Sequence, residues 1–339
     1  MRSARHTLAF LLTSTAAACA PDFEPVRYQD HLLEEAVDMH LHTGEWSLLP
    51  PRTQAYVASL FPFPLGLTPQ NLANRTLSPT GIVEQLDESG LAKGVLFAVY
   101  APASVGITKN EYMIEAIDEA PDRLYGFASV SAEHWTSDEE AQLRQLEASL
   151  QHPRVIGIKL AHAHQHIELD DERFYSIYAL AAQLEAPVYL HTGPSPFPGT
   201  YSEPEYTDPS YLEEAIETFP DTVFILGHLG YDFIGKNEGQ LEDCIELAKR
   251  FPNVYLEASA LGSSGADPSG ENYPHALRRI LEEGLVERLL YGSDGPQYPG
   301  FVNSYLERTL IAMEKAGYSH EDANGFLSAN FQNLFGLAP

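Results

Sequence analysis

Eight short runs rich in β-branched and aromatic residues recur along the chain, and stretches with helical periodicity separate most of them. The predicted strands are residues 36–40, 94–100, 124–130, 155–160, 187–191, 222–228, 254–258 and 288–293. Strands that alternate with helices form parallel sheets, because each return connection is long enough to hold a helix. Eight such units predict an α/β fold of the (β/α)8 TIM-barrel class, built as one domain over residues 34–339.

The longest connection follows the first predicted strand. Residues 43–78 are rich in proline and aromatic residues, and Trp46 lies near their beginning. In a barrel this segment is a loop insertion on the rim where substrates bind. The sequence leaves two interpretations open, a partial lid over the site and an ordinary surface insertion. Trp46 is a weak candidate for substrate binding.

Asp38, His40 and His42 are spaced two residues apart at the end of the first predicted strand. Because successive side chains of a strand alternate between its faces, we expect these three to point together and their apolar neighbours to point away. Neutral imidazole is the commonest protein ligand for zinc-like cations. For this segment alone, a histidine-rich strand end with satisfied hydrogen bonds is the alternative.

Four further strand ends carry chemically active side chains. They close the fourth, fifth, sixth and eighth predicted strands: Lys159, His191, His228 and Asp294. The carboxyl ends of all barrel strands meet at one mouth, so residues far apart in the chain can bind one ion. A single histidine here is weak evidence, but active side chains at five strand ends indicate a site.

The order of these motifs resembles the amidohydrolase superfamily, and within it the amidohydrolase family 2 or amidohydrolase-related branch. The motifs are His40-x-His42, Gly157-Ile158-Lys159-Leu160, His191-Thr192-Gly193, Gly227-His228-Leu229-Gly230, Gly292-Ser293-Asp294 and the closing Phe326–Asn330 to Phe335–Leu337. The resemblance covers residue 34 to the C-terminus. It implies a metal-dependent (β/α)8 hydrolase with one or two divalent cations, for which we expect Zn²⁺.

By this resemblance, His40, His42, His191 and Asp294 bind the cation, and His228 lies beside the substrate or a second metal. Asp294 suits a second role as the base that deprotonates a metal-bound water, and His228 suits polarising a carbonyl or stabilising an oxyanion. Lys159 has two interpretations: a carboxylated lysine that bridges two metals, by analogy with binuclear amidohydrolases, or a lysine that binds a substrate carboxylate or pairs with nearby acids.

Two weaker clusters follow other strands. His162, His164 and His166 come just after the fourth strand, and we interpret them as an exposed histidine-rich loop, with a substrate contact (His162) or an accessory metal as the alternative. Glu257 and Ser259 follow the seventh strand, where they are either substrate contacts or ordinary polar residues of the rim.

The N-terminus has the order of an export signal. Two arginines precede an apolar segment, and small residues lead to Cys19. We expect residues 1–18 to be an export signal with Cys19 as a lipidated first residue of a bacterial lipoprotein. Ordinary cleavage to a periplasmic or secreted protein and an uncleaved terminus are the alternatives. Cys244, the other cysteine, shares a helical face with apolar residues and is expected in the core.

The formal net charge is −28, with 48 acidic and 20 basic side chains. This balance excludes nucleic acid as a partner and limits membrane contact to a lipid anchor at Cys19. The expected partner is a small-molecule substrate, and the sequence leaves a homo-oligomer open. The leading interpretation is a hydrolase that activates a metal-bound water to attack a carbonyl-type carbon of an amide, lactone or ester. The rivals are a non-oxidative decarboxylase of a small unsaturated or aromatic acid and an inactive metal- or ligand-binding lipoprotein.

Overall fold

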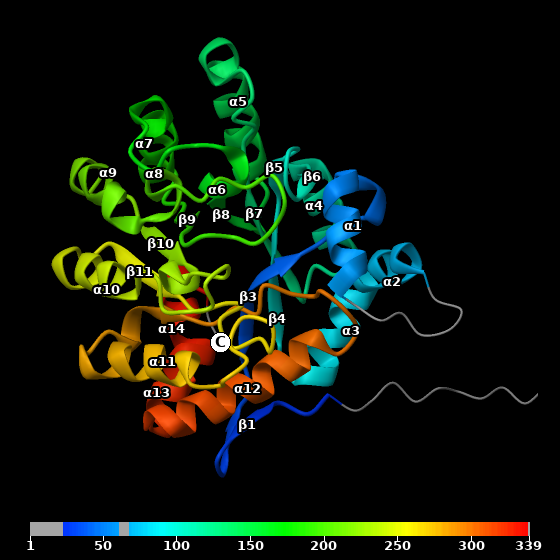
Figure 1. Ribbon diagram of the computed structural model, residues 1–339, viewed down its shortest axis with the longest axis vertical. Helices are drawn as coiled ribbons and strands as arrows, with labels where there is room; N and C mark the ends of the chain where they lie inside the picture. The colour runs from blue at the N-terminus through cyan, green and yellow to red at the C-terminus, as the bar shows by residue number, and fades with distance from the viewer. Residues whose placement is uncertain (1–22, 61–67, 338–339) are drawn as a thin grey trace, which may run out of the picture.

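The computed structural model describes residues 23–60 and 68–337, and an eight-stranded parallel barrel lies at its centre (Figure 1). Each strand pairs with the next barrel strand along the chain. The strands are β3 (Val37–His42), β4 (Lys93–Phe97), β7 (Leu124–Ala128), β8 (Val155–Leu160), β9 (Val188–His191), β10 (Phe224–Gly227), β11 (Val254–Glu257) and β12 (Leu289–Leu290). The predicted α/β barrel is confirmed, and each predicted strand region overlaps a barrel strand.

Backbone hydrogen bonds close the ring between β3 and the segment after β12. The N–H of Asp294 donates to the carbonyl of His40 at 3.0 Å, and the N–H of His42 donates to the carbonyl of Gly295 at 2.6 Å. This closure lays the segment after β12 along β3, so the two ends of the motif series become neighbours.

Large apolar side chains fill the interior of the barrel. They are Val37, Met39, Val95, Phe97, Tyr125, Phe127, Tyr189, Ile225, Leu290 and Phe331. Phe331 comes from α14 (Asn330–Phe335), which covers the amino-terminal end of the barrel. Gly157 faces Phe127, and a Cβ there would lie 2.6 Å from the phenyl ring, so the interior is packed without space to spare.

Helices surround the barrel and pack on its outer face through a second, larger apolar cluster. They are α3 (Pro79–Ser89), α4 (Asn110–Glu119), α5 (Trp135–Leu150), α7 (Tyr175–Gln183), α9 (Glu213–Thr218), α10 (Leu241–Arg250), α11 (Asn272–Glu282), α12 (Phe301–Ala316), α13 (His320–Asn324) and the π-helix η6 (Gly325–Ala329). In α3, Ser78 caps the first turn, Pro79 follows it, and Gly90 ends the helix in a left-handed conformation. Cys244 is buried in the outer cluster, as predicted.

Short elements build the rim at the carboxyl end of the strands. They are the 3₁₀ turn η1 (Trp46–Leu48), α1 (Pro51–Leu60), α2 (Pro69–Thr76), the hairpin β5 (Val99–Ala101) and β6 (Gly106–Thr108), α6 (His162–Gln165) and α8 (Pro204–Thr207). The described part of the predicted rim insertion, residues 43–60 and 68–78, is therefore largely helical.

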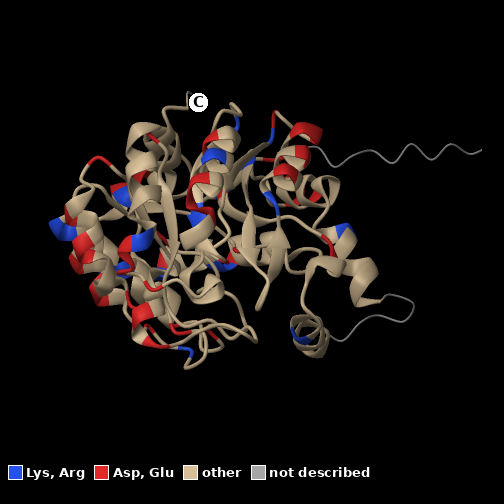
Figure 2. Ribbon diagram, turned by 90° about the horizontal axis from the view of Figure 1, so that it is seen from above, with Lys and Arg blue, Asp and Glu red and all other residues tan. Residues whose placement is uncertain are grey.

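A hairpin of β1 (Val26–Tyr28) and β2 (His31–Leu33) precedes the barrel. The expected export signal, residues 1–18, and Cys19 lie outside the described residues. Within those residues, no helix is both long and apolar enough to cross a membrane. Acidic side chains are spread over the surrounding helices, in keeping with the net charge of −28 (Figure 2).

Candidate metal centre

An extra residue in β3 sets the direction of its two histidines. Between Asp38 and Leu41, β3 has one residue more than the paired segment of β4. Such a bulge interrupts the alternation of side chains. Val37 and Met39 pack in the barrel interior, and the bulge lets the ring of His40 face the same interior, with its centroid 4.4 Å from that of Phe97. The expectation that the apolar neighbours of the histidines point away is therefore wrong for Val37 and Met39 and holds for Leu41, which packs in the outer cluster.

Asp38 supports the backbone of the site. Its Oδ1 accepts hydrogen bonds from the backbone N–H of His40 at 3.1 Å and of Ser293 at 2.9 Å. The carboxyl group is fully buried, and this burial raises its pKa to about 7. Asp38 thus joins β3 to the segment that carries Asp294.

His40, His42 and Asp294 form a tight group at the mouth of the barrel. Oδ1 of Asp294 lies 3.2 Å from Nε2 of His40 and 2.9 Å from Nε2 of His42. One ligand atom from each residue lies within 4.8 Å of the others, a suitable separation for holding a single ion. Burial would raise the pKa of Asp294, but the hydrogen bond from His42 and nearby positive charges bring it below its usual value.

Asp294 holds this position in a strained backbone conformation. Its φ is +62°, in the left-handed region that costs a non-glycine residue about 1–3 kcal/mol. The hydrogen bond from its N–H to the carbonyl of His40 holds the conformation in place. Strain of this kind at a strand end is typical of functional sites.

His40 has one nitrogen engaged and one free. Its Nδ1 lies 3.0 Å from the hydroxyl of Tyr189 and 2.9 Å from Oγ of Ser259. Its Nε2 is buried and has no hydrogen-bond partner among the described residues. Burial lowers the pKa of His40 well below its usual value, so the imidazole is neutral at pH 7. A buried lone pair beside a carboxylate fits a divalent cation.

Glu257 lies behind this group at the end of β11. Its Oε2 accepts hydrogen bonds from the Tyr189 hydroxyl at 2.9 Å, from Oγ of Ser259 at 2.9 Å and from the N–H of His228 at 3.2 Å. Because both hydroxyl hydrogens point at Glu257, the two oxygens accept hydrogen bonds from Nδ1 of His40. The interpretation of Glu257 and Ser259 as rim residues is wrong, since both are fully buried. Burial raises the pKa of Glu257 to about 7.

His228 shares this network. Its Nδ1 lies 2.9 Å from Oγ of Ser259 and 3.3 Å from the Ser259 carbonyl, and burial lowers its pKa to about 4. His40, His228 and Glu257 form a second group within 4.8 Å. The hydroxyl groups of Tyr189 and Ser259 already engage Oε2 of Glu257 and Nδ1 of both histidines, which leaves Oε1 of Glu257 as the unpaired oxygen of that group. A cation therefore fits the first group, where Nε2 of His40 is unpaired.

His191 lies at the same mouth but outside both groups. Its ring centroid is 4.6 Å from that of His228 and 4.9 Å from that of His164. Nε2 of His191 donates a hydrogen bond to the carbonyl of Gly193 at 3.2 Å, which leaves Nδ1 as the nitrogen with a lone pair. Burial lowers the pKa of His191 well below its usual value.

Lys159 points into the interior from β8. Its Nζ lies 3.7 Å from the ring centroid of Tyr189 and 4.8 Å from that of Phe97. Burial lowers its pKa to about 7, against the opposing effect of Asp294 and Glu257. Among the described residues, no carboxylate oxygen lies within 4.0 Å of Nζ.

His162 and His164 lie on α6 and are buried, so the interpretation of this segment as an exposed loop is wrong. Loops cover the helix: Oγ of Ser104 contacts Nδ1 of His164 at 3.1 Å, and the N–H of Tyr201 donates to the carbonyl of Ala163 at 3.0 Å. Neither ring nitrogen of His162 has a hydrogen-bond partner among the described residues, and burial lowers its pKa to about 3.

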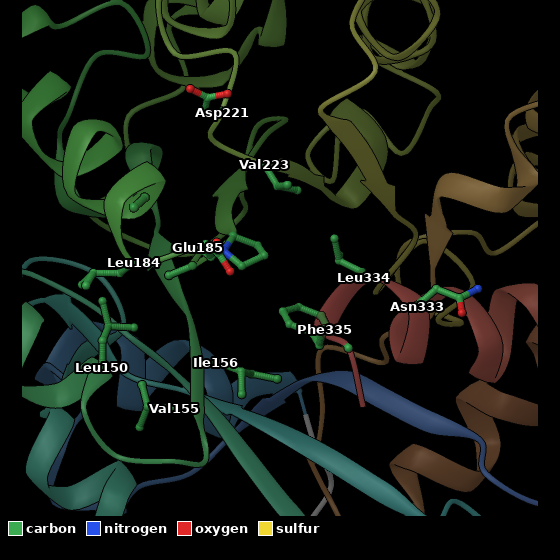
Figure 3. A pocket seen from close by; sticks show the side chains of 14 residues that line it. Leu150, Val155, Ile156, Leu184, Glu185, Asp221, Val223, Asn333, Leu334 and Phe335 are labelled. Carbon is green, nitrogen blue, oxygen red and sulfur yellow. The ribbon is translucent and has the colours of Figure 1, made fainter. Parts of the chain in front are cut away.

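A cavity of about 570 Å³ opens from these groups toward the rim. Its inner end is lined by His40, His42, Lys159, His191, His228 and Asp294. Trp46 and other residues of the rim insertion line its outer wall. A second cavity, of about 510 Å³, lies at the other end of the barrel between the strand beginnings and α14 (Figure 3). His40, His42 and Asp294 line the first cavity and not the second.

Solved structures with similar folds agree with this architecture. An uncharacterised TIM-barrel protein from Bordetella bronchiseptica is 19% identical with a TM-score of 0.66, covering 89% of this chain and 99% of that chain. A probable 2-pyrone-4,6-dicarboxylic acid hydrolase from Acinetobacter baumannii is 20% identical with a TM-score of 0.61, covering 89% and 99%. A 5-carboxyvanillate decarboxylase from Novosphingobium aromaticivorans, complexed with manganese, is 14% identical with a TM-score of 0.59, covering 90% and 96%.

At these identities the similarity establishes the fold alone. No curated protein matches the chain. The model of the amidohydrolase family, whose members are metal-dependent, matches residues 37–337, which include the whole barrel and every residue of the metal centre. The chain therefore belongs to the amidohydrolase family.

Proposed function

We propose that this chain is a metal-dependent hydrolase that adds water to the carbonyl carbon of a small amide, lactone or ester. The observation that carries the proposal is the group of two imidazoles and one carboxylate around the unpaired Nε2 of His40. His40, His42 and Asp294 would hold the cation, with His191 beside them and Zn²⁺ as the expected ion. A divalent cation bound there lowers the pKa of a bound water toward neutrality.

Asp294 is the proton acceptor in this proposal. Its pKa lies below its usual value, so the carboxylate is unprotonated at neutral pH and can take a proton from the attacking water. Asp294 has 22% of its side chain exposed and lines the cavity, whereas Glu257 behind the group is fully buried.

His228 is the proton carrier. The Ser259 carbonyl can only accept a hydrogen bond, so Nδ1 of His228 carries the hydrogen and Nε2 presents a lone pair. A neutral imidazole in this form can take over from Asp294 the proton of the attacking water and then donate it to the leaving group. In this assignment His228 passes a proton on, and it can stabilise an oxyanion by a hydrogen bond only after its Nε2 is protonated.

The test is an activity screen with two readouts. Purified protein loaded with Zn²⁺, and the same protein after chelation, are assayed against esters, lactones and amides, while carbon dioxide release from small unsaturated and aromatic acids is measured in parallel. We expect hydrolysis that disappears on chelation and returns with the metal. Metal-dependent carbon dioxide release without hydrolysis would support a decarboxylase instead. Tight metal binding with neither activity would support a binding protein.

We further propose that the protein is exported and anchored through Cys19, as the order of its first residues indicates. Expression of the full chain and of Cys19→Ala in a bacterium, followed by fractionation, tests this. The proposal requires membrane association that the substitution abolishes.

A further inference from the structure

Lys159 is a buried cation for which the described residues supply no ion-pair partner. Only 3% of the residue is exposed, and its Nζ lies over the rings of Phe97 and Tyr189. Burying an ammonium group is unfavourable unless a partner replaces the lost water. The two rings stabilise the charge through cation–π contacts, but they accept no conventional hydrogen bonds. The N–H donors of Lys159 are therefore available to a ligand.

This ammonium is next to the candidate metal group. The Phe97 and Tyr189 rings that contact Lys159 also contact His40, at centroid distances of 4.4 and 5.0 Å. Lys159, His40 and Asp294 all line the inner end of the 570 Å³ cavity. A small molecule bound at the Lys159 ammonium therefore has its remaining atoms close to His40 and Asp294.

The cavity walls limit what that molecule can be. Four aromatic side chains are among the lining residues, which favours an apolar or planar body: Trp46, Tyr56, Phe197 and Phe233. Among the described residues that line the cavity, Lys159 and Lys236 are the only lysines or arginines, and Lys236 is exposed. One point charge at the inner end, with Asp294 nearby, suits a monoanion. A phosphate dianion would need more donors than this wall offers.

We propose that Lys159 is an anion-binding subsite, and that the substrate is a small molecule with an apolar body and a carboxylate that this ammonium binds. The inference rests on the proposed hydrolase and names its substrate class. The scissile carbonyl then lies toward His40, His42 and Asp294, while the carboxylate is held at Lys159.

The experiment compares acids with amides of the same shape. Benzoate, cyclohexanecarboxylate and acetate, each paired with its amide, are titrated calorimetrically into the full chain, both loaded with Zn²⁺ and after chelation. The variants are Lys159→Met and the matched control Lys249→Met, an exposed lysine of α10 that does not line the cavity. We expect the chelated wild-type protein to prefer at least one acid over its amide. Lys159→Met should weaken binding of that acid by about 10- to 100-fold, the scale of a lost buried charge partner, and leave amide binding within about twofold.

Lys249→Met should leave both affinities within about twofold. The inference is overturned if no acid is preferred by the wild-type protein, a result that needs no variant. It is equally overturned if Lys159→Met binds acids as the wild type does, or if ¹³C-bicarbonate labelling finds a carbamate on Lys159. Binding is read without turnover. If Lys159→Met loses acid binding but the wild-type protein hydrolyses no substrate, the subsite is retained and the hydrolase is rejected. If the wild-type protein is a hydrolase but Lys159→Met binds acids normally, the hydrolase is retained and the subsite is rejected.

Discussion

Replacing Glu257 by glutamine tests whether one buried carboxylate orients two histidines of the site. In the wild type, Oε2 of Glu257 accepts three hydrogen bonds, and the two hydroxyl groups among these donors contact Nδ1 of His40 and Nδ1 of His228. Glutamine keeps one oxygen but replaces the other by an NH₂ group, and it carries no charge. The glutamine oxygen can take the place of Oε2, but the NH₂ group then takes the place of Oε1, 3.6 Å from Nδ1 of His40. Two donors then face each other, and the three donors to Oε2 lose their charged acceptor.

The expected magnitude follows from the contacts. Loss of a partner that orients a metal-binding histidine costs about 10- to 100-fold in metal affinity, or about 1.4–2.7 kcal/mol. A hydrogen bond to a charged group contributes roughly 1 kcal/mol more to the free energy of unfolding than a hydrogen bond between neutral groups. Three such bonds set an upper limit of about 3 kcal/mol on the loss of unfolding free energy, because removing a buried charge returns part of it.

The assay is a Zn²⁺ titration against a competing chelator, with urea unfolding of the same samples. Tyr189→Phe provides a matched comparison, since it removes one hydroxyl and keeps the ring beneath Lys159. Glu246→Gln, an exposed position on α10, is the control and should change neither quantity. Metal affinity equal to that of the wild type in folded Glu257→Gln would refute the reasoning, because the network would then have no influence on the ligands.

Three further substitutions test separate parts of the account. Asp294→Ala should lower kcat by about two to four orders of magnitude while metal stays bound at saturating concentration. Steady-state kinetics measures the turnover and elemental analysis the bound metal, and normal turnover would mean that the base is another residue. His162→Leu removes a buried imidazole with a folded pKa of about 3 against 6.5 unfolded. As pH falls below 6.5, the unfolded chain binds a proton at this histidine and the folded protein does not. Between pH 7.5 and 5.0 the wild type should therefore lose about 2 kcal/mol more unfolding free energy than the variant. An equal loss for both proteins in urea unfolding would contradict a buried neutral His162. Gly292→Ala places a Cβ 2.2 Å from Oε1 of Glu257, so chelator competition should find metal affinity lowered at least about tenfold, and unchanged affinity would mean that the carboxylate moves freely.

The barrel and the mouth of the site could be predicted from the sequence because both follow from short-range patterns. Buried parallel strands appear as apolar runs, and crossover helices separate them at regular intervals. Once the fold is a barrel, the strand ends must meet, so the proximity of His40 and Asp294 follows from topology. The hydrogen bond from the N–H of Asp294 to the carbonyl of His40 joins the two strand ends directly.

The parts that could not be predicted depend on details of register and packing. The bulge that turns His40 to the same side as Met39 is set by the pairing of β3 with β4, which leaves no mark in the spacing of residues. Glu257 resembles any acid at a strand end until Tyr189 and Ser259 are placed against it. His162 and His164 suggested a solvated loop because polar residues alternate there, and only the covering segments bury them.

Diffraction from crystals of the full chain grown with Zn²⁺, recorded on both sides of the zinc absorption edge, tests the central claim most directly. The account predicts an anomalous peak bound by Nε2 of His40, Nε2 of His42 and a carboxylate oxygen of Asp294. A peak bound instead by Glu257 and His228, or a fully occupied ion away from the mouth of the barrel, would contradict it.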